Sequence, residues 1–153
     1  ISANIGEPPK SISKIASGGE LSRIMLAVKN VLSTHDDIPT LIFDEIDAGV
    51  SGKTAAKIGF KIKQVSKNRQ VICVTHLAQI AAYADSHLLI EKSENQTDTR
   101  TTVSVLDAQG RVDELARILG GSEITRTTRD NARELLTQAA RAQVERAQAG
   151  KTD

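Results

Sequence analysis

The chain has 153 residues, of which 39% are apolar, and its aromatic side chains are two Phe, one Tyr and no Trp. Its 20 basic and 19 acidic side chains give a net charge of +1, so charge alone indicates neither nucleic acid nor an acidic partner. Because no apolar run is long enough to span a membrane, no signal peptide is evident and the single Cys73 excludes an internal disulfide, we expect a cytoplasmic protein with no membrane partner. The length suits a single domain with an aliphatic core.

The first predicted element is an amphipathic helix that starts near Gly19. Its expected inner face is made of apolar residues spaced three or four apart: Leu21, Ile24, Met25, Val28, Val31 and Leu32. After Pro39, the run "TLIFDE" predicts a strand buried on both faces. Ser51 is a suitable N-cap for a second helix. The inner face expected for that helix is Ala55, Ile58, Ile62 and Val65.

The second half of the chain continues the alternation of strands and helices. "QVICVTH" predicts a buried strand, "LAQIAAYA" a short helix and "SHLLIEK" a third strand, which together favour an α/β fold with a mostly parallel sheet. The polar "SENQTDT" precedes "TRTTVSVL", which has the alternation of an edge strand that completes a hairpin. "VDELARIL" predicts a helix that stops at Gly120-Gly121, and residues 128–148 predict a last helix before an Ala/Arg/Gln-rich tail.

The stretch "GVSGKT" resembles the end of a phosphate-binding loop, but the pattern is incomplete. A Walker A loop needs G-x-x-x-x-G-K-[ST], and the position of its first glycine holds Asp47. Asp44 and Glu45 add two more negative charges, which is the wrong sign for a cradle of anions. We therefore expect Lys53 not to be a phosphate ligand.

The acids have a better interpretation at the end of the strand. In nucleotide hydrolases, a buried strand ending in two acids places the first beside Mg²⁺ and the second towards the attacking water, and "LIFDE" ends in Asp44 and Glu45. The next buried strand ends at His76, which could contact a γ-phosphate because parallel strands place their carboxyl ends at one edge. Two solvated acids and an ordinary loop histidine are the alternatives for each feature taken alone.

Upstream, Ser17-Gly18-Gly19-Glu20 stands at the predicted start of the first helix. The glycines let backbone N–H groups approach an anion, the serine adds a donor, and the helix N-terminus adds positive partial charge. A plain N-cap would explain the same four residues. The order S-G-G-E, helix, strand with D-E, D-x-G, then strand with T-H is typical of the ATP-binding-cassette (ABC) ATPase head, with Asp47 in the D-loop.

Four segments narrow this resemblance: "ASGGELSRIMLAVK", "LIFDEIDAGVSGKTA", "VICVTHLAQIAAYAD" and "ELARILGG". They resemble the C-terminal lobe of the head in the bacterial RecN family of recombination and repair proteins, relatives of the SMC (structural maintenance of chromosomes) proteins. The approach "ISANIGEPPKSISKIASGGE" is similar as well. Glu20 stands where transporter cassettes usually have glutamine, and residues 48–52 depart from the D-x-A-L-D of SMC heads towards RecN. The resemblance implies that residues 1–153 form one domain, the C-terminal part of a head whose Walker A lobe and coiled coil are absent from this chain.

The resemblance also implies a role for each motif residue. Asp44 would hold Mg²⁺ through water, Glu45 would be the general base, and His76 would contact the γ-phosphate. The remaining site residues, which would act on the ATP of a partner head or couple the two sites, are Ser17, Gly18, Gly19, Glu20 and Asp47.

The implied partners are the N-terminal Walker A lobe of the same protein, a second head in an ATP-dependent homodimer, DNA and a recombinase. The implied function is ATP hydrolysis in DNA double-strand-break repair at the nucleoid, with little ATP binding or hydrolysis by this chain alone. A transporter's nucleotide-binding domain is one alternative, which Glu20 and the D-loop oppose. A non-catalytic dimerisation module is another, which the presence of both acids opposes.

Overall fold

A computed structural model describes residues 6, 8, 17–32, 37–95, 98–121 and 123–149. The chain divides into two compact units, residues 1–77 and residues 78–153. Most of the approach to the first helix, residues 96–97 within the polar segment "SENQTDT" and the tail from residue 150 lie outside the described residues. None of the described helices is both long enough and apolar enough to cross a membrane.

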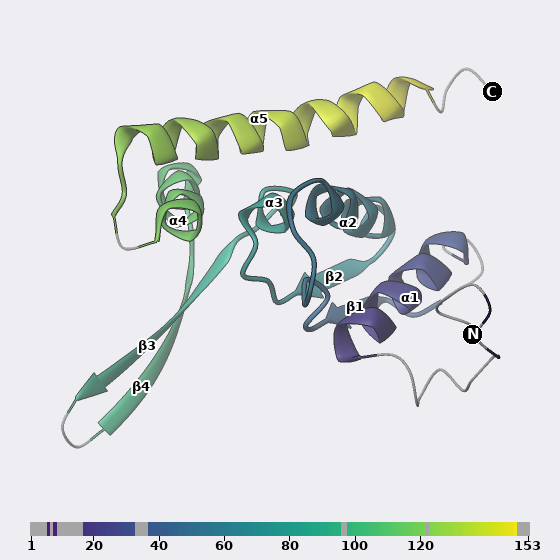
Figure 1. The fold of residues 1–153 in the computed structure, drawn as a ribbon, viewed down its shortest axis with the longest axis horizontal. Coiled ribbons are helices and arrows are strands. Elements are labelled where there is room, and N and C mark those ends of the chain that lie inside the picture. Colours follow the sequence, from purple (N-terminus) through teal and green to yellow (C-terminus); the bar gives the residue numbers. More distant parts are fainter. Residues whose placement is uncertain are drawn as a thin grey trace. The chain divides into compact units, whose positions relative to one another are not determined.

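The first unit contains a βαβ arrangement preceded by a helix (Figure 1). Its elements are α1 (Gly18–Val31), β1 (Thr40–Phe43), α2 (Gly52–Val65) and β2 (Gln70–Cys73). The strands β1 and β2 pair in parallel, from Thr40 opposite Gln70 to Phe43 opposite Cys73. The predicted order of elements is therefore confirmed over this unit, and the carboxyl ends of both strands lie at one edge.

The helix α2 begins where the sequence predicts. Ser51 is its N-cap residue, although the serine side chain makes no capping hydrogen bond. Ala55, Ile58 and Val65 are buried on its inner face. Gly52 and Lys53 therefore belong to the first turn of an amphipathic helix, and Lys53 is exposed.

Much of the apolar surface predicted to be buried in this unit is exposed. Phe43 is buried, but its neighbour Ile42 is 69% exposed. Ile72, which pairs with Ile42 on β2, is 42% exposed. The prediction of a strand buried on both faces is therefore wrong for β1 in this structure. The reason is that, among the described residues, nothing covers the face that carries Ile42 and Ile72.

The helix α1 shows the same behaviour. It buries Gly19 and Leu26, while the predicted inner face lies largely in solvent, with Met25 51% exposed. Because successive residues turn by about 100° around a helix, Met25 lies about 100–120° around α1 from Leu26 and Gly19 and therefore outside the buried side. The other exposed members of that apolar stripe are Leu21, Val28 and Leu32.

The second unit combines three helices with a hairpin. Its elements are α3 (Ala78–Ala81), β3 (Leu88–Asn95), β4 (Asp98–Val105), α4 (Ala108–Gly120) and α5 (Arg126–Ala149). Its core is built mostly from small side chains, which let the helices approach closely: Ala78, Ala81, Ala82, Val112, Leu115, Ala116, Ala132 and Ala139. The predicted stop at Gly120-Gly121 is confirmed, since the N–H of Gly121, at φ 69°, caps the carbonyl of Arg117 at 2.8 Å.

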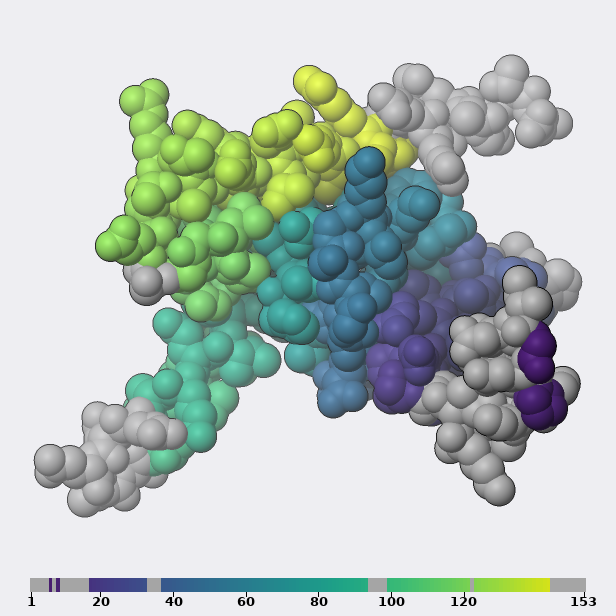
Figure 2. Space-filling view, in the orientation of Figure 1, coloured from purple at the N-terminus to yellow at the C-terminus, as the bar shows by residue number. Residues whose placement is uncertain are grey.

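The strand β3 does not extend the parallel sheet. It pairs with β4 in an antiparallel hairpin, so the described residues form two separate two-stranded sheets rather than a three-stranded parallel one. Local antiparallel pairing needs only a tight turn, whereas a parallel neighbour must come from elsewhere in the chain. One face of the hairpin carries the exposed pairs Leu88–Val105 and Ile90–Val103. In Figure 2 the hairpin projects away from the helices of its own unit.

Candidate functional site

The motif residues of the first unit gather around one loop, residues 44–48, which connects β1 to α2. His76 follows β2 at the same edge of the sheet. Asp47 is 3% exposed and accepts hydrogen bonds on Oδ2 from Thr75 Oγ1 at 2.6 Å and from the backbone N–H of His76 at 2.9 Å. The Nδ1 atom of His76 lies 3.1 Å from the same oxygen. The structure thus brings Asp47 and His76 together within one chain.

These contacts determine the charge state of Asp47. Burial opposes ionisation, but the hydrogen bonds from Thr75 and from the His76 backbone outweigh it and lower the pKa of Asp47 below its ordinary value. The carboxylate can therefore hold the imidazole of His76 through Nδ1. Since the His76 side chain is 75% exposed, Nε2 is the nitrogen left to meet a ligand such as a phosphate.

The N-terminus of α1 is closed by a capping box, as the S-G-G-E pattern indicates. The backbone N–H of Ser17 donates to Glu20 Oε2 at 2.8 Å, and the backbone N–H of Glu20 donates to Ser17 Oγ at 3.4 Å. The backbone N–H of Ser17 and its hydroxyl, which donates to Glu20 Oε2 at 3.1 Å, lower the pKa of the Glu20 carboxyl. Glu20 therefore has a structural role as part of the cap. The cap is present whether or not these residues also bind a ligand.

Glu45 lies against the glycines of the same helix N-terminus. A Cβ atom at Gly18 would lie 2.7 Å from Oε2 of Glu45, and a Cβ atom at Gly19 would lie 2.7 Å from the Glu45 carbonyl oxygen and 2.8 Å from Cβ of Ala48. At Gly19 only glycine permits this approach, because a backbone oxygen and a Cβ atom stand in the way, whereas at Gly18 the atom met is the end of a flexible side chain. Glu45 itself has φ 55°, a left-handed conformation that is costly for a residue with a side chain. The loop is therefore strained at the predicted general base.

Two residues that the sequence interpretation missed hold this loop to α1. Ser22 Oγ donates to the carbonyl of Asp44 at 2.9 Å. Arg23 Nη1 donates to the carbonyls of Ile46 at 3.1 Å and Ala48 at 2.8 Å. Their contacts span more than twenty positions in the chain, and neither residue type marks such a contact by itself. Their place on the buried side of α1, one turn after Gly18 and Gly19, is the signal that could have indicated them.

Asp44 fits the chemistry expected of a magnesium ligand. Its side chain is exposed at the end of β1, and Oδ1 accepts the backbone N–H of Glu45 at 2.9 Å. Carboxylate oxygens are the ligands that Mg²⁺ prefers, and this ion commonly keeps most of its waters and takes one or two protein carboxylates together with phosphates. Within the described part of the chain, no group of three or more His, Cys, Asp or Glu residues could hold a metal ion alone.

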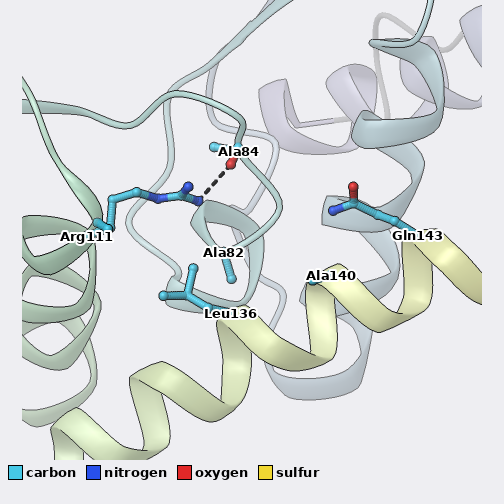
Figure 3. Close-up of a pocket in the computed structure, with 7 residues that line it drawn as sticks. Ala82, Ala84, Arg111, Leu136, Ala140 and Gln143 are labelled. Carbon is cyan, nitrogen blue, oxygen red and sulfur yellow. Dashed lines mark hydrogen bonds between the residues drawn. The ribbon is translucent and has the colours of Figure 1, made fainter.

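The second unit contains a separate hollow of about 270 Å³. Arg111, on α4, reaches across it and donates to the carbonyl of Ala84 at 2.7 Å (Figure 3). The other lining residues are Ala82, Ala84, Ala108, Leu136, Ala140 and Gln143. No motif residue contributes to this hollow, so the candidate site is the cluster around residues 44–48.

Several known proteins that are similar to this chain carry the description "DNA repair protein RecN". The protein of Bacillus subtilis is 52% identical over 139 residues, which are 91% of this chain and 24% of that protein. Those of Streptomyces coelicolor and Treponema pallidum are 50% and 48% identical, covering 88% and 92% of this chain but 23% and 25% of their own lengths. By sequence, the chain is RecN-like. It spans about a quarter of the length of these curated RecN relatives, and no protein-family model matches it.

A solved structure supports the fold. It comes from work on "ATP-driven dimerization and DNA stimulated activation of SMC ATPases" and matches with a TM-score of 0.50 and 26% identity over 77% of this chain and 70% of that one. The resemblance to RecN and the predicted α/β class of an SMC-like ATPase lobe are therefore confirmed. The correction to β3 concerns its pairing and leaves this class unchanged.

Proposed function

We propose that this chain is one half of the ATP-hydrolysing head of a RecN-like DNA repair protein and that it acts with a Walker A lobe of the same protein. The observation that carries the proposal is the convergence on one loop of Glu45, of Asp47 bound to His76, and of the α1 N-terminus. The likeness to RecN over about nine-tenths of the chain supports it. Both units would belong to this single lobe.

Each residue of the cluster would have a distinct task. Asp44 would hold hydrated Mg²⁺, which neutralises phosphate charge when bound, and Glu45 would accept a hydrogen bond from the water that attacks the γ-phosphate. His76 would donate from Nε2 to a phosphate oxygen. Asp47 would orient the imidazole through its contact with Nδ1, which leaves Nε2 to face the nucleotide.

The remaining motif residues would serve a second nucleotide. Ser17, Gly18 and Gly19, at the N-terminus of α1, would bind the γ-phosphate held by a partner head, with Glu20 fixing the cap. Asp47 would orient His76 within the chain in addition to coupling the two sites. Since Glu45 lies beside Gly18, the proposed trans site and the proposed general base of one chain adjoin.

The exposed apolar surfaces of the first unit suit a partner segment. The stripe on α1 and the sheet face with Ile42 and Ile72 are apolar and uncovered among the described residues. Exposed apolar patches of this kind mark interaction sites. Because the RecN relatives are about four times as long as the chain, we propose that the Walker A lobe covers these surfaces. ATP-dependent head dimers, DNA, a recombinase and a nucleoid location are the further parts of the proposal.

Replacement of Glu45 by glutamine in the complete protein tests this function. Glu45→Gln keeps the shape of the side chain but removes the charge that orients water, so ATP binding should persist while turnover falls by about 10²- to 10⁴-fold. Lys53→Ala is the control, because Lys53 lies on the first turn of α2 and should change the ATP dissociation constant by less than about threefold. Wild-type turnover by Glu45→Gln would contradict the proposed catalysis, and a tenfold loss of affinity in Lys53→Ala would restore the P-loop interpretation.

A further inference from the structure

The loop that carries Glu45 is held by α1 on both sides of that residue. Ser22 Oγ binds the carbonyl of Asp44, immediately before Glu45, at 2.9 Å. Arg23 Nη1 binds the carbonyls of Ile46 and Ala48, after it, at 3.1 Å and 2.8 Å. One guanidinium nitrogen thus bridges two carbonyls of the turn, whose own closing bond runs from the Ala48 N–H to the Glu45 carbonyl at 3.0 Å.

The conformation that these bonds hold is one that Glu45 would otherwise leave. Its φ of 55° is unfavourable for a residue with a side chain, so the surrounding contacts must impose it. The Gly19 backbone is close enough that a Cβ atom there would lie 3.1 Å from Arg23 Nη1. Gly19 at the helix N-terminus therefore packs tightly against both Arg23 and the turn that contains Glu45. No water would fit between Gly19 and these two neighbours.

We infer that Arg23 is a positioning residue for ATP hydrolysis, which acts by holding the strained turn that aims the Glu45 carboxylate. This inference rests on the proposed function. Because Arg23 belongs to the helix whose N-terminus would meet the partner's nucleotide, any movement of α1 on dimerisation passes directly to Glu45 through these two carbonyl bonds. Arg23 itself touches no reacting atom.

A test in the complete protein compares two replacements of Arg23. Arg23→Met keeps an unbranched stem but has no donor, and it should lower kcat by at least about tenfold while the ATP dissociation constant stays within about threefold, because misplacement of a catalytic group by about 1 Å is costly. Arg23→Lys should recover a large part of kcat, since both bonds come from a single nitrogen that an ammonium can imitate. Lys57→Met, an equivalent change on the exposed side of α2, should leave kcat within about twofold.

Combination with Glu45→Gln separates positioning from a merely structural role. If Arg23 acts through the Glu45 carboxylate, Arg23→Met should lower the residual rate of Glu45→Gln by less than about twofold, because residues that act as a unit are not additive. A further tenfold loss in that background would overturn the inference, and so would wild-type kcat in Arg23→Met. Should Arg23→Met fail to fold, Ser22→Ala removes the other bond and should show the same non-additivity with a loss of about two- to fivefold.

The results for the two variants show whether the role of Arg23 or the proposed ATP hydrolysis itself is wrong. An inactive Glu45→Gln together with a wild-type-like Arg23→Met overturns the role of Arg23 alone. A wild-type-like Glu45→Gln overturns both the proposed function and this inference.

Discussion

At the scale of single residues, the site depends on one oxygen atom of a buried acid. Oδ2 of Asp47 accepts hydrogen bonds from the Thr75 hydroxyl and from the backbone N–H of His76. Nδ1 of the His76 ring lies 3.1 Å from the same oxygen. These contacts fix the start of the segment after β2 relative to the loop after β1. A buried acceptor with several donors is costly to remove, because the donors then lose their partner without regaining water.

We expect Asp47→Asn to destabilise the fold by about 1 kcal/mol and Asp47→Ala by about 2–3 kcal/mol. The pKa of Asp47 is lowered in the folded state, so its ionised form contributes stability above the unfolded pKa of about 3.9, and this contribution is lost as the pH falls through the lower folded pKa. Urea unfolding at pH 7 and at pH 3 should show a smaller difference between wild type and Asp47→Asn at the acidic pH. A difference that grows on acidification would contradict this assignment of charge.

The two glycines at the start of α1 should differ in their tolerance of a methyl group. At Gly19 the added carbon would meet the Glu45 carbonyl and the Ala48 side chain, so Gly19→Ala should cost about 1–3 kcal/mol. At Gly18 it would meet only the mobile end of the Glu45 side chain, so Gly18→Ala should cost much less. Thermal unfolding of the matched pair measures the difference, and equal melting temperatures would show that α1 and the loop are less closely packed.

The S-G-G-E cap, the acids after β1 and His76 after β2 could be predicted because each depends on a few neighbouring residues. The positive φ of Glu45 and the bonds of Arg23 could not, since they depend on how α1 packs against a loop more than twenty residues away. The resemblance implies that Asp47 couples the two heads. Its buried contact with His76 depends on the pairing of β1 with β2, which a local pattern does not specify.

At the scale of elements, the part of α1 that contacts the loop carries small and polar residues. Gly19, Ser22 and Arg23 lie against the loop, while the apolar stripe that includes Met25 and Val28 is turned away. The periodicity correctly predicted a helix, because helical spacing is a local property. It could not predict which face is covered, because the segment that we propose to cover the stripe lies outside this chain.

Thiol labelling of the complete protein tests whether the stripe is covered. A cysteine in place of Met25 should react with a maleimide at least about tenfold more slowly than a cysteine in place of Lys57, which lies on the polar side of α2. The reason is that the proposed Walker A lobe packs against the stripe and not against that side of α2. Equal labelling rates would show that the stripe remains in solvent and would remove this part of the proposal.

At the scale of the whole molecule, the proposed function requires a composite site between two heads. This chain would supply Asp44, Glu45 and His76 to one nucleotide and the N-terminus of α1 to another. The two sets adjoin through Glu45 and Gly18, so one chain would stand between two sites of a symmetric dimer. Such an arrangement would make hydrolysis depend on dimerisation, because neither head alone would complete a site.

Size-exclusion chromatography of the complete protein with ATP shows whether the heads form this composite site. Glu45→Gln should accumulate as dimers, because it binds ATP but hydrolyses it slowly. Ser17→Arg should stay monomeric while still binding ATP, since a long cation would occupy the place where the helix N-terminus closes on the partner's phosphate. Ser17→Ala, which loses the cap but adds no bulk, should still form dimers. Equal dimerisation by Glu45→Gln and Ser17→Arg would contradict the composite site.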